Sequence, residues 1–232
     1  MAEAGMMNNL NFHRFDDEEK LAFSLTQSIV DDLNDAIAEK GSASLIVSGG
    51  STPKKLFKAL SKINIDWDKI KIGLCDERLV EPTHNDSNEK LVRETLMTSY
   101  AQQATFIDMA SEDETACSMR VKELLMPFDV IVLGMGEDGH TASLFPNNPR
   151  LDEAYDQTKE NVCIKIVPQY APHSRMSLTL GAILSARHVY LHFQGESKLN
   201  VYKEALRGAD SFAMPIRAII NQTDKKIEVY SA

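Results

Sequence analysis

An aspartate and a histidine two residues apart, inside a glycine-rich stretch, are the strongest candidates for chemistry in this sequence. Asp138 and His140 lie within Gly-Met-Gly-Glu-Asp-Gly-His-Thr-Ala-Ser-Leu-Phe-Pro, residues 134–146, directly after the apolar run Val130–Leu133. Imidazole changes its charge near neutral pH, so His140 is a candidate general base, and a carboxylate two residues earlier could orient it. The spacing alone is equally compatible with a loop histidine that has no catalytic role.

The same glycines also match G-x-G-x-x-G, the pattern of dinucleotide-binding loops. In those loops the pattern opens a long helix, whereas Pro146 and Pro149 would interrupt any helix that begins at Gly139. Glu137 and Asp138 would also place carboxylates beside a pyrophosphate. We therefore expect no nicotinamide or flavin cofactor.

A second glycine turn has the composition of an anion-binding site. It follows the apolar residues 45–47 and precedes a predicted helix, for which Thr52 is the expected cap and Pro53 the expected first residue. Unpaired amides and the helix dipole at such a turn attract anions, although an ordinary glycine turn is the alternative. A Walker A loop is excluded because its Gly-Lys-Ser/Thr ending is missing. The candidate anion-binding residues are Ser48, Gly49, Gly50, Ser51 and Thr52.

Three consecutive charged residues follow the next predicted strand, residues 70–75. Charges at a strand end are costly to bury unless they are paired or bound to a charged ligand. Arg78 could bind a phosphate or carboxylate through two parallel hydrogen bonds. Asp76 and Glu77 could accept hydrogen bonds from sugar hydroxyls or hold Arg78 in place. An ion cluster on the surface is the alternative explanation.

Two further basic residues are candidates for the same anion. Arg175 stands at the far end of a loop that Pro168 and Pro172 stiffen. Lys198 falls in the first turn of a helix that begins after Gly195, where a cation is unfavourable unless an anion lies against the same helix end.

The elements that would position these residues follow an α/β pattern. Capping pairs predict helix starts at Asp16 with Glu19 and at Ser111 with Glu114, and the first of these helices should end at Gly41. Short apolar runs predict strands at residues 45–47, 70–75, 130–133, 162–167, 176–180, 188–193 and 227–230.

The predicted fold is a mostly parallel sheet flanked by helices, Rossmann-like, in a single domain over residues 1–232. Each candidate loop begins where a predicted strand ends. Because the carboxyl ends of parallel strands lie at one edge of a sheet, the four loops should line one crevice there. These loops are residues 48–52, 76–78, 134–140 and 195–198.

Composition narrows the possible partners and location. The formal net charge is −9, so no surplus of basic residues exists to bind nucleic acid or an anionic membrane. No apolar run has the length of a membrane span, and residues 1–15 lack the order of a signal peptide, so we expect a cytoplasmic protein. The sequence does not indicate whether residues 1–7 are ordered.

No metal site is expected. The three cysteines, Cys75, Cys117 and Cys163, are far apart and are most simply buried thiols. No H-x-x-x-H or H-E-x-x-H spacing is present. Structural roles are expected for three of the other histidines, whereas two in polar loops stay undecided; the first group is His13, His188 and His192, and the second is His84 and His173.

Taken together, these motifs resemble those of the glucosamine-6-phosphate isomerase/6-phosphogluconolactonase family, and in particular its 6-phosphogluconolactonases. They occur in the family's order over nearly the whole chain, and Gly-His-Thr-Ala-Ser-Leu-Phe-Pro is the most specific of them. The other matching stretches are residues 48–53, 76–78, 86–88, 175–179 and 195–198.

The resemblance implies the fold shared with glucosamine-6-phosphate deaminases and ribose-5-phosphate isomerases. It also implies hydrolysis of 6-phospho-D-glucono-1,5-lactone to 6-phosphogluconate without a cofactor. His140 would activate a water molecule, Asp138 would orient the imidazole or the substrate, and amides of the glycine turn, including that of Gly136, would stabilise the oxyanion. Arg78, Arg175 and Lys198 would hold the phosphate together with residues 48–52.

Two other functions stay open at this point. Relatives that deaminate and isomerise glucosamine 6-phosphate have a different sequence after the Gly-His pair, where this chain has residues 141–146. A phosphosugar sensor without catalysis would normally carry a DNA-binding module. The expected partner is a small phosphosugar lactone, and the chain is expected to be a monomer or a small homo-oligomer.

Overall fold

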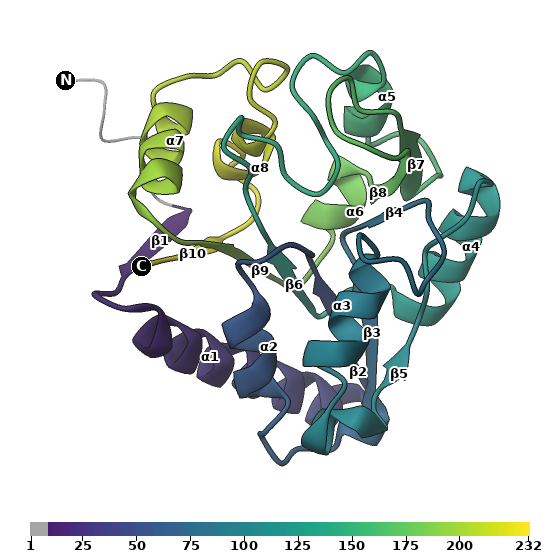
Figure 1. Cartoon of the computed structure of the whole chain (residues 1–232), viewed down its shortest axis with the longest axis vertical. Coiled ribbons are helices and arrows are strands. Elements are labelled where there is room, and N and C mark those ends of the chain that lie inside the picture. Colours follow the sequence, from purple (N-terminus) through teal and green to yellow (C-terminus); the bar gives the residue numbers. More distant parts are fainter. Residues whose placement is uncertain (1–8) are drawn as a thin grey trace.

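A computed structural model describes residues 9–232 and contains a seven-stranded sheet flanked by helices (Figure 1). Every neighbouring pair of strands in this sheet is parallel. Across the sheet the strands follow the order β1 (Leu10–Arg14), β10 (Ile227–Ser231), β9 (His188–Phe193), β6 (Val130–Leu133), β2 (Ala43–Val47), β3 (Ile70–Leu74) and β5 (Thr105–Phe106). The predicted mostly parallel α/β fold is confirmed.

The strand order reverses between β2 and β6. From β2 the chain adds β3 and β5 on one side, then returns to place β6 on the other side of β2. Connections leave such a pair of strands in opposite directions, so a crevice opens beyond their carboxyl ends. The glycine turns that follow β2 and β6 both lie at this position. This explains how Ser48 and Gly134 meet although they are 86 positions apart in the chain.

A second, three-stranded antiparallel sheet changes one prediction. Its order is β4 (Asp76–Arg78), β8 (Arg175–Leu178) and β7 (Cys163–Ile166). Residues 76–78 therefore form a strand rather than a loop, because their backbone pairs with a segment about 100 residues later. This pairing places Arg78 directly opposite Arg175. The predicted strand at 176–180 also ends early, since Leu180 begins a helix.

The predicted helices are present, but several begin at a different residue. The helices are α1 (Glu18–Lys40), α2 (Lys54–Leu60), α3 (Asn88–Thr95), α4 (Glu114–Leu125), α5 (Leu151–Tyr155), α6 (Leu180–Leu184), α7 (Glu196–Leu206) and α8 (Ile216–Ile220), with 3₁₀ turns at Trp67–Lys69 and Ser99–Gln103. Asp17 rather than Asp16 caps α1 through the Lys20 amide, and Asp113 rather than Ser111 caps α4. Pro53 occupies the cap position of α2, so Thr52 does not cap it.

The core is built from the strands that carry the candidate loops. Every residue of β2 and β6 is buried, and both strands belong to one hydrophobic cluster with the inner faces of the helices. Helix α1 packs along β2, β6 and β10, and it ends at Gly41 with a left-handed backbone, as predicted. Among residues 9–232 no helix is long and apolar enough to cross a membrane.

Candidate active site

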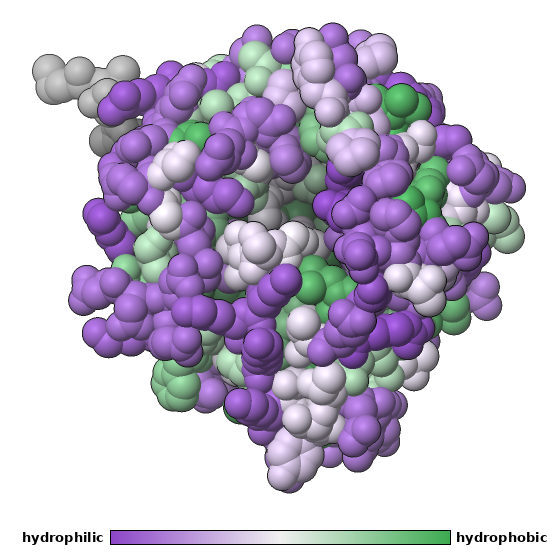
Figure 2. Space-filling model, viewed as in Figure 1, coloured by the Kyte–Doolittle hydropathy of each residue, from purple (hydrophilic) through white to green (hydrophobic). Residues whose placement is uncertain are grey.

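One cavity opens where the glycine turns after β2 and β6 meet. It holds about 820 Å³ of space, including its open mouth, and Figure 2 shows the hollow near the middle of this face of the molecule. Almost all the candidate residues line it together: Ser48, Gly49, Gly50, Ser51, Thr52, Asp76, Arg78, Gly136, His140, Arg175 and Lys198. Two candidates, Asp138 and Glu77, are not among the lining residues. The expectation of a single crevice is thus met by the geometry.

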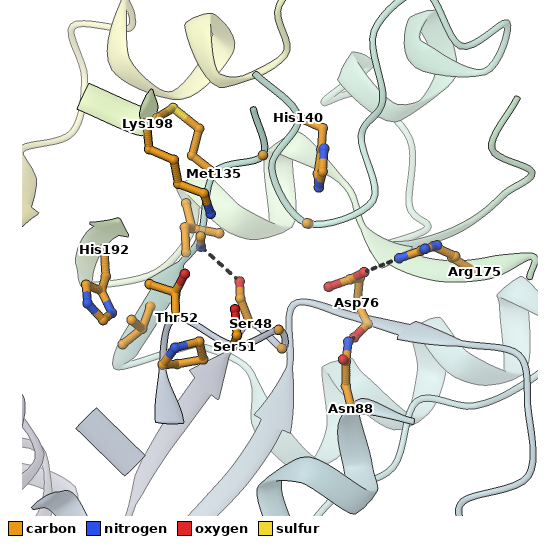
Figure 3. Close-up of a pocket in the computed structure, with 18 of the residues that line it drawn as sticks. Ser48, Ser51, Thr52, Asp76, Asn88, Met135, His140, Arg175, His192 and Lys198 are labelled. Atoms are coloured by element: carbon orange, nitrogen blue, oxygen red, sulfur yellow. Dashed lines mark hydrogen bonds and ion pairs between the residues drawn. The ribbon is translucent and has the colours of Figure 1, made fainter. Parts of the chain in front are cut away.

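His140 is held by Asp138 behind it. The Nδ1 atom of His140 lies 2.6 Å from Oδ1 of Asp138, and the same oxygen accepts the His140 amide at 3.1 Å. Since a carboxylate only accepts, Nδ1 carries the proton, which leaves Nε2 as the nitrogen able to take one. Burial raises the pKa of Asp138, but the hydrogen bond and charge of His140 outweigh it, so that the pKa lies below its ordinary value. Figure 3 shows the His140 ring directed into the cavity.

Two glycines make this arrangement possible. A β-carbon at Gly136 would overlap the His140 ring and approach Asp138 closely. Gly139 has a left-handed backbone with φ of 78°, and a β-carbon there would overlap Met214. The amides of both glycines are used inside the turn, because Gly136 N donates to His140 O and Gly139 N donates to Gly136 O. The turn therefore positions the imidazole, and these two amides are not free to bind an oxyanion.

The turn after β2 forms the opposite wall. Ser48 Oγ accepts a hydrogen bond from Gly134 N at 3.1 Å, which ties the two glycine turns together. Gly49 has no room for a β-carbon because the Asn88 side chain packs against it, and Gly50 has φ of 91°. Ser51 and Thr52 then face the cavity from below Lys198 in the view of Figure 3.

Asp76 forms a buried polar centre on the right-hand side of Figure 3. It accepts a hydrogen bond from Ser143 Oγ, and its Oδ2 lies 3.8 Å from Arg175 Nη1. Asn88 Nδ2 donates to the Asp76 backbone carbonyl at 2.8 Å. Asp76 is only 6% exposed, and a buried carboxylate needs donors such as these to offset the loss of water. Because it also lines the cavity, it can accept a hydrogen bond from a polar ligand there.

The cations of the cavity are incompletely neutralised. Within residues 9–232, the buried Nε atoms of Arg78 and Arg175 have no hydrogen-bond partner. Arg175 is 8% exposed, and burial lowers the pKa of its guanidinium, with the neighbouring Arg78 adding to the effect and Asp76 opposing it. Burial also lowers the pKa of Lys198, although Glu137 partly compensates. Three cations and one carboxylate line the cavity of a protein with net charge −9, so the cavity carries a local excess of positive charge that favours an anion.

Glu77 has a structural position instead of a place in the cavity. Its carboxylate accepts hydrogen bonds from the amides of Asn88, Glu89 and Arg78 and from Ser87 Oγ. Glu77 therefore fixes the start of α3, and burial raises its pKa despite these donors. The contact of Glu77 with Arg78 is through the backbone amide of Arg78, and Glu77 is not among the residues that line the cavity.

His192 lines the cavity although a purely structural role was predicted for it. It is 2% exposed, and its Nδ1 has no hydrogen-bond partner among the described residues. Burial, with the charge of Lys198, lowers its pKa to about 4. A signal in the sequence could have indicated this position. His192 lies at the carboxyl end of β9, and the carboxyl ends of the parallel strands open on the crevice. The other lining residues that the sequence did not single out as site residues are Pro53, Asn88, Val132, Leu133, Gly134, Met135 and Ala142.

The other sulfur and histidine predictions are resolved by the structure. All three cysteines are buried and free, as predicted. His13 pairs with Glu228 at 2.8 Å, and His188 lies 3.2 Å from Asp32, so both have structural contacts outside the cavity. The sequence left His84 and His173 undecided; their ring centroids lie 5.4 Å apart, next to Asp86, whose backbone carbonyl accepts a hydrogen bond from Arg78.

Comparison with known proteins places this geometry in a family. Residues 16–229 match the family model described as glucosamine-6-phosphate isomerases/6-phosphogluconolactonase. The chain is 39% identical to a 6-phosphogluconolactonase of Rhizobium meliloti (strain 1021), over 96% of this chain and 98% of that protein. It is 42% identical to a 6-phosphogluconolactonase of Pseudomonas aeruginosa over 86% of each.

Solved structures agree with these sequence matches. The crystal structure of a 6-phosphogluconolactonase from Shewanella baltica superposes with a TM-score of 0.91 at 43% identity, covering 98% of this chain and 100% of that one. The 6-phosphogluconolactonase from Thermotoga maritima, at 23% identity and a TM-score of 0.77, shares the fold. The chain therefore belongs to the glucosamine-6-phosphate isomerase/6-phosphogluconolactonase family.

Proposed function

We propose that this protein is a 6-phosphogluconolactonase, a carboxylic ester hydrolase that converts 6-phospho-D-glucono-1,5-lactone to 6-phospho-D-gluconate in the oxidative pentose phosphate pathway. The relatives with 33 to 42% identity described as 6-phosphogluconolactonases support this activity. The observation that carries it is the oriented His140 imidazole at the edge of a cavity lined by three cations. This pairing suits a substrate that carries a phosphate at one end and an ester carbonyl at the other.

His140 acts as the general base in this proposal. Its Nε2 takes a proton from a water molecule whose oxygen attacks C1 of the lactone, and the C1–O5 bond of the tetrahedral intermediate then breaks. The same imidazole, now protonated, returns the proton to O5, so the ring opens to the hydroxy acid. Asp138 keeps Nδ1 protonated throughout and stabilises the imidazolium while it exists.

The phosphate is bound by cations drawn from Arg78, Arg175 and Lys198, together with the hydroxyls and amides of residues 48–52. The unpartnered Nε atoms of the two arginines support this role, because buried guanidinium groups favour a ligand that completes their hydrogen bonds. Binding the phosphate far from the reacting carbon converts binding energy into orientation of C1 toward His140.

The oxyanion needs a donor other than the Gly136 and Gly139 amides. Those amides already donate within the turn, so neither of them serves as the oxyanion donor. In this proposal one of the three cavity cations serves as that donor, and the other two hold the phosphate with residues 48–52. A well-placed donor to an oxyanion contributes about 3 to 4 kcal/mol to catalysis.

We further propose that residues 1–232 work as one domain, in the cytoplasm, as a monomer or a small homo-oligomer. The continuous core that joins the sheet to the flanking helices supports the single domain. A small phosphosugar lactone is the proposed partner, with no nucleic acid or membrane bound, in keeping with the net charge. The proposed reaction needs no cofactor, because an imidazole and water suffice for ester hydrolysis.

The test is acid release from freshly prepared lactone with and without the protein, in the presence of a metal chelator. The rate without protein must be subtracted, because the lactone also hydrolyses spontaneously. We expect rapid turnover that the chelator does not reduce. Ammonia release from glucosamine 6-phosphate would instead indicate the deaminase alternative, and binding of 6-phosphogluconate without lactone turnover would indicate a sensor.

A further inference from the structure

Two loops outside the cavity bring a second group of chemically capable side chains together. One loop connects β4 to α3 and carries His84 and Asp86, and the other connects β7 to β8 and carries His173. The Leu79 amide donates to the Ser174 carbonyl at 2.8 Å, so the loops lie against each other. None of the three side chains lines the cavity already described.

The three side chains converge on one point. One ligand atom from each of His84, Asp86 and His173 lies within 4.8 Å of the other two. His173 Nε2 is 2.9 Å from Asp86 Oδ2, and His84 Nδ1 is 3.8 Å from the same oxygen. In a tetrahedral zinc site with bonds of about 2.0 to 2.1 Å, neighbouring ligand atoms lie about 3.3 Å apart. The two separations from Asp86 bracket this value and the His84 and His173 ligand atoms lie within 4.8 Å of each other, so side-chain rotations would complete the geometry.

The types and states of these groups favour a transition metal. Two imidazoles and one carboxylate suit zinc, whereas magnesium and calcium prefer oxygen ligands. The Asp86 amide donates to His84 Nδ1 at 3.1 Å, so this nitrogen carries the lone pair that a metal requires. His173 Nε2 donates to Asp86 Oδ2 at 2.9 Å, so an ion bound by both groups would replace this proton and release it.

We propose that His84, Asp86 and His173 bind one zinc ion, with water as the fourth ligand, and that this ion ties the two loops together. The site is structural and lies outside the catalytic machinery. It adjoins the substrate-binding end of the cavity, because Arg78 donates to the Asp86 carbonyl and Arg175 follows His173 by two residues. The sequence did not indicate this site because the ligands come from loops 87 residues apart, so no short histidine spacing exists.

The test is zinc binding by the full-length protein after removal of metals with EDTA and exchange into chelator-free buffer. Calorimetric titration with zinc chloride should give one site per chain. Cobalt(II) should give the absorption bands of a tetrahedral site, and zinc should raise the melting temperature. All three readouts are independent of lactone turnover, so they distinguish failure of this site from failure of the proposed function.

Two variants locate the site. His173→Asn removes one ligand, and asparagine tolerates the left-handed backbone at this position, where φ is 66°. His84→Gln removes another ligand from a side chain that is 46% exposed, so folding should not be affected. Each variant should bind zinc at least about tenfold more weakly and lose most of the rise in melting temperature.

The matched control is His13→Gln, which removes a surface histidine from a similar histidine–carboxylate pair with Glu228. This variant should bind zinc like the unaltered protein. The proposal is overturned if the unaltered protein binds no zinc, in which case the cluster is an ion pair only. It is also overturned if His173→Asn and His84→Gln bind zinc as tightly as His13→Gln does.

Discussion

The Asp138 carboxylate contacts Nδ1 of the His140 ring at 2.6 Å, which leaves Nε2 as the available nitrogen of a ring that is directed into the cavity (Figure 3). This relationship decides which nitrogen can act on a substrate. The two groups are only two positions apart in the chain. Their geometry therefore depends on the glycine turn that brings them together. The first three predictions follow from this turn.

Replacing His140 with asparagine should lower kcat by at least about a hundredfold, the usual contribution of a general base. The side chain is partly exposed at the cavity mouth, so circular dichroism and the melting temperature should change little. Steady-state kinetics with the spontaneous rate subtracted is the measurement. Near-normal turnover in this variant would remove His140 from the mechanism.

Asp138→Asn should lower kcat by at least about tenfold and leave KM nearly unchanged. The asparagine amide can donate to Nδ1 and thereby favour the wrong tautomer, with the proton on Nε2. The effect should be smaller than that of His140→Asn, because the base itself is retained. If KM instead rises about tenfold while kcat stays constant, Asp138 binds the substrate and does not orient the imidazole.

Gly136→Ala should lower kcat, because the added methyl group would displace the His140 ring from its contact with Asp138. Gly134→Ala is the matched control in the same turn. A β-carbon there would lie 3.8 Å from Ser48 Cβ, an ordinary contact, so activity should be retained. Comparable losses in both variants would show that the turn tolerates no side chain anywhere, and the specific role of Gly136 would be contradicted.

Arg175→Lys should raise KM for the lactone about tenfold, equivalent to about 1.4 kcal/mol, with a smaller change in kcat. Lysine keeps the charge but loses the planar fork that can bind phosphate through two hydrogen bonds. The control is Arg187→Lys, which changes an exposed arginine paired with Glu39. Unchanged KM together with unchanged competition by inorganic phosphate would place the phosphate elsewhere in the cavity.

His192 should make the protein less stable in acid. Its folded pKa is about 4, below the ordinary 6.5, so between these values the unfolded chain binds a proton that the native protein does not. The free energy of unfolding should therefore fall as the pH drops from about 6.5 to 4, by up to about 3 kcal/mol from this residue.

Urea denaturation at several pH values measures this effect. His192→Gln should flatten the pH dependence in the same window, because glutamine does not titrate. His13→Gln serves as the comparison, since it removes a partly exposed histidine at the surface. Parallel pH profiles for the His192 variant and the unaltered protein would contradict the prediction.

Much of the site could be predicted because its signals are local. The apolar runs at β2, β6 and β9 identify buried parallel strands, and the glycines after them identify turns at the strand ends. Parallel strands send their carboxyl ends to one edge, so the convergence of residues 48–52, 134–140 and 195–198 follows from strand type alone. Helix starts were less accurate, because neighbouring acidic and hydroxyl residues compete for one cap, as Asp113 and Ser111 do.

Only the tertiary structure decided the features that depend on pairing between distant segments. Nothing in the sequence near residues 76–78 indicates that they form β4 and pair with β8. This pairing places Arg78 opposite Arg175. The orientation of a strand residue toward or away from the crevice likewise depends on its neighbours, which is why His192 was assigned a purely structural role. The local turns and the pairing of Asp138 with His140 can be predicted from the sequence because they depend on neighbouring residues, whereas long-range packing fixes which charges face the cavity and which loops meet beside it.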